Sequence, residues 1–166
     1  MHVSKGSVLF ACVLVCAAAF VWLTSVRLPT LVASHFGSSG AATGFMRYGF
    51  YVCFMLAFVV GLPPLLVVTT WLALSGKKAR INLPNKAYWW APERRAETIA
   101  FLRSGILWFA TTLVAFLCYV HWLVVVANEV QPAHLANSWF VGGLVGFLAG
   151  VFIWLKVFLG RFRRSA

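Results

Sequence analysis

The chain has 166 residues, of which 62% are hydrophobic and only 10% are charged. Typical soluble domains have about 45–50% apolar and about 25% charged residues, so this composition excludes a small water-soluble domain and predicts an integral membrane protein. The net charge of +11 does not indicate nucleic-acid binding, because most basic residues lie beside long apolar runs. Membrane topology and anionic lipid headgroups account for them there.

Four apolar runs are each long enough to cross a bilayer, which takes about 20 helical residues. They predict an all-α integral membrane protein in which residues 1–166 form a single domain of four transmembrane helices. The predicted spans are residues 7–26, 48–75, 105–127 and 139–160. The segments between them are loops 27–47 and 128–138 on one side of the membrane and loop 76–104 on the other. The first run is longer than the apolar core of a signal peptide, so we expect it to remain as a helix.

The lysine and arginine residues predict the orientation, because short loops rich in these residues stay in the cytoplasm. If the N terminus is cytoplasmic, twelve of the 14 basic residues lie on the cytoplasmic side and only Arg27 and Arg47 lie outside. Tryptophans occur near the predicted span ends or in loop 76–104, as expected from the preference of indole for the headgroup level. We therefore expect both termini to be cytoplasmic.

The first outer loop contains the sequence LPTLVASHFGSSGAATGF, from Leu28 to Phe45. Its glycine, serine and threonine residues indicate a turn that returns the chain between two apolar helices. His35 is the one ionisable side chain in this stretch. His35 can be a solvated loop residue with no further role. A segment that only connects two helices, however, does not require a His-Phe pair.

Pro63 and Pro64 lie inside the second span. Each removes a backbone donor and crowds the carbonyl four residues earlier, so a kink or break in this helix is predicted. The bend can serve packing alone, or the freed carbonyls can line a binding site.

The cytoplasmic loop contains one further helix signal. Pro92, followed by Glu93 and Glu97, is typical of a helix N-terminus. We expect this helix to run along the membrane surface or straight into the third span.

His121 is the only histidine inside a predicted span, and ionisable groups at membrane depth are costly enough to suggest a function. Histidine and cysteine suit a soft metal such as Cu(I) or Zn. The candidate ligands are His35, Cys53, Cys118, His121, Glu129 and His134. None of them has the spacing of CxxC or HExxH, so we expect no cofactor. The alternative is that the cysteines pack as small apolar residues and that His121 hydrogen-bonds to a neighbouring helix.

Gly142, Gly146 and Gly150 repeat at four-residue intervals in the last span and therefore share one helical face. Small residues at this spacing let a second helix approach closely. We expect packing inside the domain, and the alternative is an interface with a second copy.

The residues that enzymes use are scarce in this chain. Aspartate is absent, and the three glutamates lie in predicted loops or at a helix start. The sequence also has no phosphate-binding glycine loop or nucleophile elbow. We expect no enzymatic activity, with a histidine-dependent reaction as the one enzymatic alternative.

The first outer loop has the order Leu-Pro, five residues, His-Phe and then a turn with two glycines. This order resembles the LPxxxPxHF loop of the bacterial membrane domain found in SdpI-type immunity proteins, which joins a first helix to a second. The matching residues are Leu28, Pro29, His35, Phe36, Gly40 and Gly44. Val32 or Ala33 stands where that family often has a second proline, and Thr43 where it often has an acidic residue. The resemblance covers roughly residues 7–75.

The resemblance implies immunity to a secreted peptide toxin or membrane signalling that sequesters a repressor. Our leading hypothesis is a non-enzymatic, multi-pass protein of the bacterial inner membrane that acts through protein contacts. It would be an SdpI-like immunity or signalling protein or a small accessory subunit, with the bilayer and other membrane subunits, or itself, as partners. The alternative is a metal-handling or small-substrate transport protein that uses the outer histidines.

Overall fold

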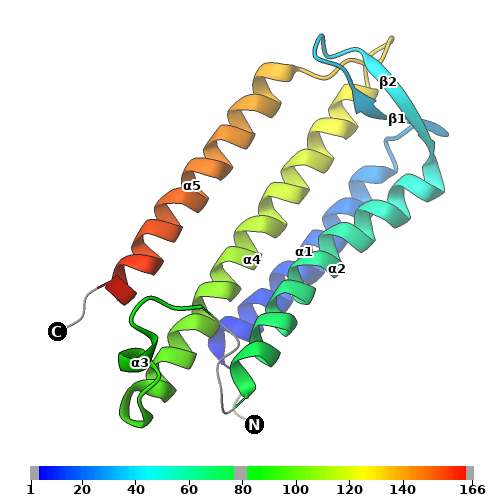
Figure 1. Cartoon of the computed structure of the whole chain (residues 1–166). Coiled ribbons are helices and arrows are strands. Elements are labelled where there is room, and N and C mark those ends of the chain that lie inside the picture. Colours follow the sequence, from blue (N-terminus) through cyan, green and yellow to red (C-terminus); the bar gives the residue numbers. More distant parts are fainter. Residues whose placement is uncertain (1–3, 77–81, 164–166) are drawn as a thin grey trace.

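The computed structural model describes residues 4–76 and 82–163, and in these residues the chain forms helices and one antiparallel hairpin (Figure 1). The elements in chain order are α1 (Lys5–Ser25), β1 (Leu31–Phe36), β2 (Ala42–Arg47), α2 (Tyr48–Ser75), α3 (Lys86–Trp89), α4 (Pro92–Asn128) and α5 (Asn137–Arg163). The predicted orientation rests partly on Lys77, Lys78, Arg80 and Arg164, which lie outside the described residues.

Four of these helices, α1, α2, α4 and α5, are long and apolar enough to cross a membrane. Their positions agree with the four predicted spans. The predicted helix at Pro92 continues straight into the third span, so that α4 is one helix of 37 residues. The four long helices run side by side, and the first residues of α1 and the last of α5 lie at the same end as α3 (Figure 1). We call this the α3 end and the opposite end the hairpin end.

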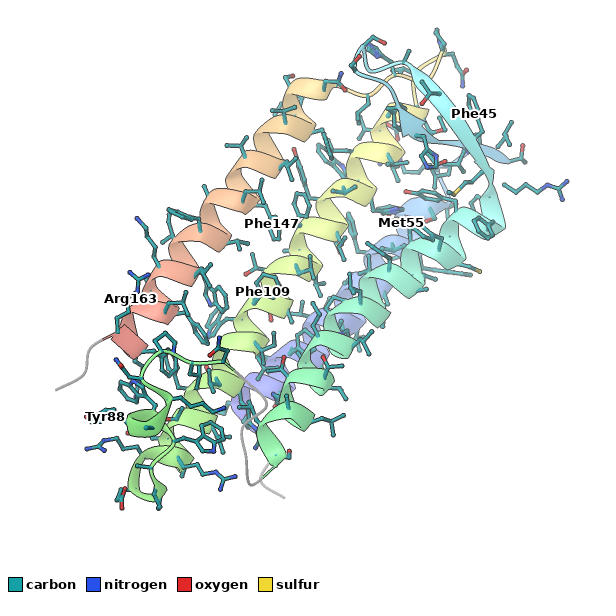
Figure 2. All side chains as sticks on the ribbon, viewed as in Figure 1. Phe45, Met55, Tyr88, Phe109, Phe147 and Arg163 are labelled. Atoms are coloured by element: carbon teal, nitrogen blue, oxygen red, sulfur yellow. The ribbon has the colours of Figure 1, made fainter. Side chains whose placement is uncertain are left out.

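The main core lies among α1, α2 and α4. Val21, Val59 and Val114, one from each of these helices, are fully or almost fully buried in it. By contrast, α5 packs mainly against α4, through ring pairs such as Phe116 with Phe147, whose centroids are 4.3 Å apart (Figure 2). The most apolar window of α5 has no buried residue. The structure is therefore a three-helix bundle with a fourth helix laid along one side.

The α2 helix is continuous from Tyr48 to Ser75 and includes Pro63 and Pro64. The two prolines therefore do not break the helix. Pro63 is buried among the neighbouring helices. A kink at this point stays a prediction.

The all-α prediction places residues 27–47 in an outer loop, and the structure differs from it by two strands in this segment. Most of the segment forms the antiparallel hairpin of β1 and β2, in which Val32 pairs with Met46 and His35 with Gly44. The turn closes through two backbone bonds: the Gly37 N–H donates to the Ala41 carbonyl and the Gly40 N–H to the Gly37 carbonyl, each at 2.9 Å. The serines and glycines that indicated a loop thus form a hairpin turn.

Candidate functional site

The hairpin is held on the end of α4 by the side chain of Asn128. Its amide oxygen accepts from the Ala33 N–H at 2.8 Å, and its amide nitrogen donates to the Ala33 carbonyl at 2.9 Å. Val32 and Ala33 are fully buried at this contact. Asn128 therefore pairs with β1 through its side chain as a neighbouring strand would through its backbone.

We expect Asn128→Leu to destabilise the protein by about 2 kcal/mol, because both Ala33 backbone groups would stay buried without a partner. Thermal unfolding in detergent measures this. Asn137→Leu is the matched control, since the Asn137 amide also donates to a hairpin carbonyl, that of Ser38, but at an exposed position. Equal losses for the two variants would contradict the role assigned to Asn128.

The connection between α4 and α5 pairs with the hairpin turn. The Leu135 N–H donates to the Gly40 carbonyl at 2.8 Å, and Ala41 forms a β-bridge with His134. Gly40 has a positive φ of 89°. A Cβ atom at this position would lie 2.4 Å from both the His134 ring and the Leu135 carbonyl oxygen. Two segments that are distant in sequence therefore meet at a residue that must be glycine.

Below the hairpin, His121 is fully buried and links three helices. Its Nδ1 lies 3.0 Å from the Tyr51 hydroxyl of α2, and its Nε2 lies 2.9 Å from the Thr24 hydroxyl of α1. The Tyr51 ring stacks on the imidazole, and the Phe20 ring meets it edge-on. The two hypotheses for His121 were a metal ligand and a hydrogen bond between helices, and the structure shows the hydrogen bond.

The direction of these hydrogen bonds follows from the Thr24 hydroxyl, which lies 2.7 Å from the Phe20 carbonyl oxygen. A carbonyl can only accept, so Thr24 donates to it and has a lone pair left for the imidazole. A neutral His121 ring then carries its proton on Nε2 and accepts from Tyr51 at Nδ1. Both ring nitrogens are in use, so this arrangement favours a structural connection at the hairpin end.

The other candidate ligands lie apart in several environments. His35 is exposed on β1, with its Nδ1 3.0 Å from the Ser34 hydroxyl. Glu129 forms an ion pair with Arg27. Cys53 is exposed on α2 and Cys118 is half-buried on α4. Among residues 4–76 and 82–163, no three His, Cys, Asp or Glu side chains are grouped so that they could share a metal ion.

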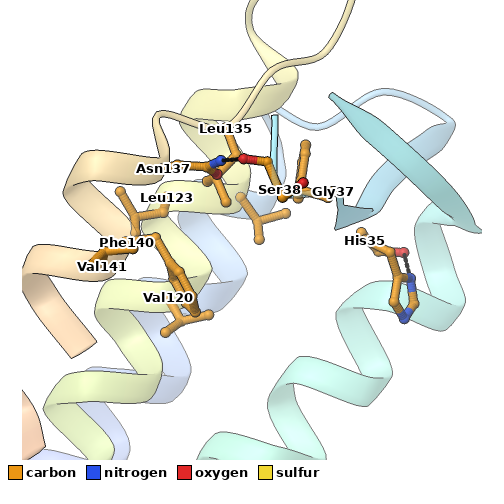
Figure 3. Close-up of a pocket in the computed structure, with 12 residues that line it drawn as sticks. His35, Gly37, Ser38, Val120, Leu123, Leu135, Asn137, Phe140 and Val141 are labelled. Carbon is orange, nitrogen blue, oxygen red and sulfur yellow. Dashed lines mark hydrogen bonds between the residues drawn. The ribbon is translucent and has the colours of Figure 1, made fainter. Parts of the chain in front are cut away.

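A cavity of about 620 Å³ lies between the hairpin, α4 and the start of α5 (Figure 3). Its walls are mainly apolar, with Val120 and Leu123 on α4 and Phe140 on α5. In Figure 3 the ring of His35, which also lines the cavity, lies apart from these side chains. The cavity can accept an apolar group, such as a lipid chain or a side chain of another protein.

The loop motif residues have mixed roles in the hairpin. Leu28 is buried before β1, and Pro29 is half-buried beside it. Phe36 packs against the cluster formed by Leu123, Ala127 and Leu135. At Gly44, a Cβ atom would lie 3.2 Å from the His35 side chain, so this glycine lets the histidine lie across the hairpin.

The glycines of α5 divide into two sets. A Cβ atom at Gly143 would lie 2.1 Å from the Tyr119 ring, so Gly143 forms the close contact with α4. At Gly142, Gly146 and Gly150 a Cβ atom would have no heavy atom of another element of the described chain within 4 Å. The predicted packing of these three glycines inside the domain is therefore not seen. We call them the α5 glycine face.

The fold and these sites define a protein of four potentially membrane-crossing helices with a hairpin cap over one end. Comparisons with family models, with curated proteins and with solved structures gave no match to this chain.

Proposed function

We propose that this chain is a non-enzymatic, multi-pass protein of the bacterial inner membrane that acts through contacts with a neighbouring subunit. The α5 glycine face receives a transmembrane helix of that subunit, which is either a different membrane protein or a second copy. The observation that supports this most directly is the open space beside Gly142, Gly146 and Gly150.

The position of the glycine face explains why it is free. One side of α5 faces α4. On this side lie the close contact of Gly143 and the ring contacts of Phe147, Trp154 and Phe158. At 100° per residue, residues 142, 146 and 150 lie about 130°, 90° and 50° around the helix from that side. Each glycine costs about 1 kcal/mol of helix stability relative to alanine. A second helix that packs closely on this face would offset that cost, because it makes more van der Waals contacts with the glycines than lipid chains do.

Two routes lead from this surface to a biological role. The resemblance of the first outer loop to SdpI-type proteins favours immunity or signalling, in which the hairpin faces the outside of the cell. The same glycine face would equally serve a small accessory subunit of a larger membrane complex. For the immunity route, deletion should sensitise cells to a secreted peptide toxin and His35→Ala should reproduce that sensitivity.

The contact itself can be tested in native membranes with a photo-crosslinking amino acid at Ile153, which is 62% exposed and lies on the same side of α5 as Gly146. We expect it to attach to a peptide from one transmembrane helix at a reproducible stoichiometry, because a packed helix excludes lipid from this face. The same amino acid at Leu148, which is 54% exposed and lies about 160° around the helix from Gly146, should attach mainly to lipid. An adduct of twice the chain mass would identify a second copy as the neighbouring subunit.

Gly146→Leu is the substitution that should disrupt this contact. It should abolish the adduct formed from position 153 without lowering the unfolding temperature, since a Cβ at position 146 has no heavy atom within 4 Å. Gly61→Leu is the control, because a Cβ at Gly61 in α2 also has no heavy atom within 4 Å. Lipid adducts alone at both 153 and 148 would overturn the proposal.

A further inference from the structure

A second cavity, of about 630 Å³, lies at the α3 end of the structure, between α3, α4 and α5. It is separate from the glycine face and from the hairpin. Its lining residues are Trp89, Phe101, Lys156, Val157, Gly160 and Arg161. It therefore combines two cationic side chains with aromatic and aliphatic walls.

The two cations of this cavity are available for an anion. Lys156 is exposed, with its ammonium 4.8 Å from the centre of the Phe152 ring, and it forms no ion pair with a carboxylate of the described residues. Arg161 pairs with Glu97, whose side chain is 72% exposed. An ion pair this open to solvent is weak, so a phosphate can compete with the carboxylate for the guanidinium.

One wall of the cavity is fixed by hydrogen bonds to the last turn of α5. The Asn85 amide and the Trp89 indole both donate to the Phe162 carbonyl, each at 3.2 Å. These bonds hold α3 against α5. They also satisfy one of the carbonyl groups that give a helix C-terminus its negative character, which would otherwise repel an anion.

The depth of the cavity suits an amphiphile better than a free anion. Lys156 lies seven residues before the end of α5, about 10 Å along the helix axis. Its long side chain can reach from this depth to the headgroup level. The neighbouring Val157 is 71% exposed and, in a membrane, would face lipid chains. Cationic groups thus lie directly beside a surface suited to acyl chains.

We propose that this cavity binds one anionic phospholipid, with its phosphate between Lys156 and Arg161 and its acyl chains along Val157 and the apolar surface of α5. Basic pockets between transmembrane helices are typical sites for such headgroups. The inference does not depend on the α5 glycine face. It places the α3 end of the protein in the membrane leaflet that contains the anionic phospholipid.

Native mass spectrometry of the full chain tests this. Protein purified in mild detergent is incubated with phosphatidylglycerol or with phosphatidylcholine, and the retained lipid is counted. We expect one strongly retained phosphatidylglycerol. In Lys156→Gln/Arg161→Gln its affinity should fall about 30-fold, which is about 2 kcal/mol. Arg94→Gln removes one positive charge from α4 outside the cavity, as Lys156→Gln does within it, and should leave retention unchanged.

Further measurements distinguish lipid binding from general anion binding and from unfolding. Inorganic phosphate at millimolar concentration should not displace the lipid, and Glu97→Gln should keep or raise retention because it releases Arg161. The exposed single variant Lys156→Gln should weaken binding at an unchanged unfolding temperature. Equal retention of the two lipids, displacement by inorganic phosphate, or unchanged retention in the double variant would overturn the proposal.

Discussion

Gly40→Ala is expected to destabilise the protein by about 3 kcal/mol, although it adds a single methyl group. The backbone at this position has a φ of 89°, which costs an L-residue about 1–2 kcal/mol. The new Cβ would also lie 2.4 Å from the His134 ring and from the Leu135 carbonyl oxygen. The turn and the connection from α4 to α5 would have to separate, and the bond from the Leu135 N–H to the Gly40 carbonyl would be lost.

Thermal unfolding in detergent and amide exchange at Leu135 measure the two consequences of this change. Gly49→Ala is the control, because a Cβ at Gly49 in α2 meets no heavy atom within 4 Å. This control should be neutral or slightly stabilising, since alanine favours a helix over glycine by up to about 1 kcal/mol. An unfolding temperature for Gly40→Ala as high as that of the control would refute the proposed contact.

His121→Ala is expected to lower the free energy of unfolding by about 2–4 kcal/mol. The substitution removes the two hydrogen bonds that join α4 to α1 and α2, and it leaves a cavity where the buried ring lay. Hydrogen bonds between transmembrane helices contribute on average only about 0.6 kcal/mol each. Most of the loss should therefore come from the cavity and from the unpartnered Tyr51 hydroxyl.

A double-mutant cycle separates these contributions. Tyr51→Phe removes one hydrogen bond and keeps the ring, so it should cost about 0.6–1.7 kcal/mol. In the His121→Ala background the same change should cost less, because the hydroxyl has already lost its partner. The control His35→Ala, on the exposed face of β1, should stay within about 0.5 kcal/mol of wild type. Additive losses for His121 and Tyr51 would show that the two side chains do not interact.

The helices could be predicted from the sequence because the bilayer imposes a length and a composition that are visible locally. The predicted second span, residues 48–75, has the same bounds as α2. The merging of the Pro92 helix with the third span was one of two alternatives. In the structure the two form one helix, α4, and the Thr98 hydroxyl donates to the Trp89 carbonyl of the preceding α3 at 2.9 Å.

The hairpin was missed for a different reason. The segments LVASHF and ATGFMR do not alternate clearly between apolar and polar residues, and an isolated two-stranded hairpin has little stability of its own. The hairpin instead depends on the side chain of Asn128, which lies 95 residues from Ala33 in the sequence. A contact of this range leaves no local signal.

A weak signal in the sequence could have identified the hydrogen-bond partners of His121. Thr24 lies near the outer end of the first predicted span and Tyr51 near the outer end of the second, which places both at the depth of His121. Matching polar side chains by depth would have suggested a shared network. The rotation of each helix, which decides whether such side chains actually meet, comes only from packing.

The length of α4 has a mechanical consequence. At 1.5 Å per residue its 37 residues form a rod of about 55 Å, well beyond the roughly 30 Å apolar thickness of a bilayer. Asn128 fastens one end of this rod to the hairpin, while Phe101 near the other end forms a wall of the second cavity. If α4 rotates by about 5° about one of its ends, the opposite end moves by about 5 Å. This helix can therefore transmit a small rotation at the hairpin end as a displacement of several ångströms at the α3 end.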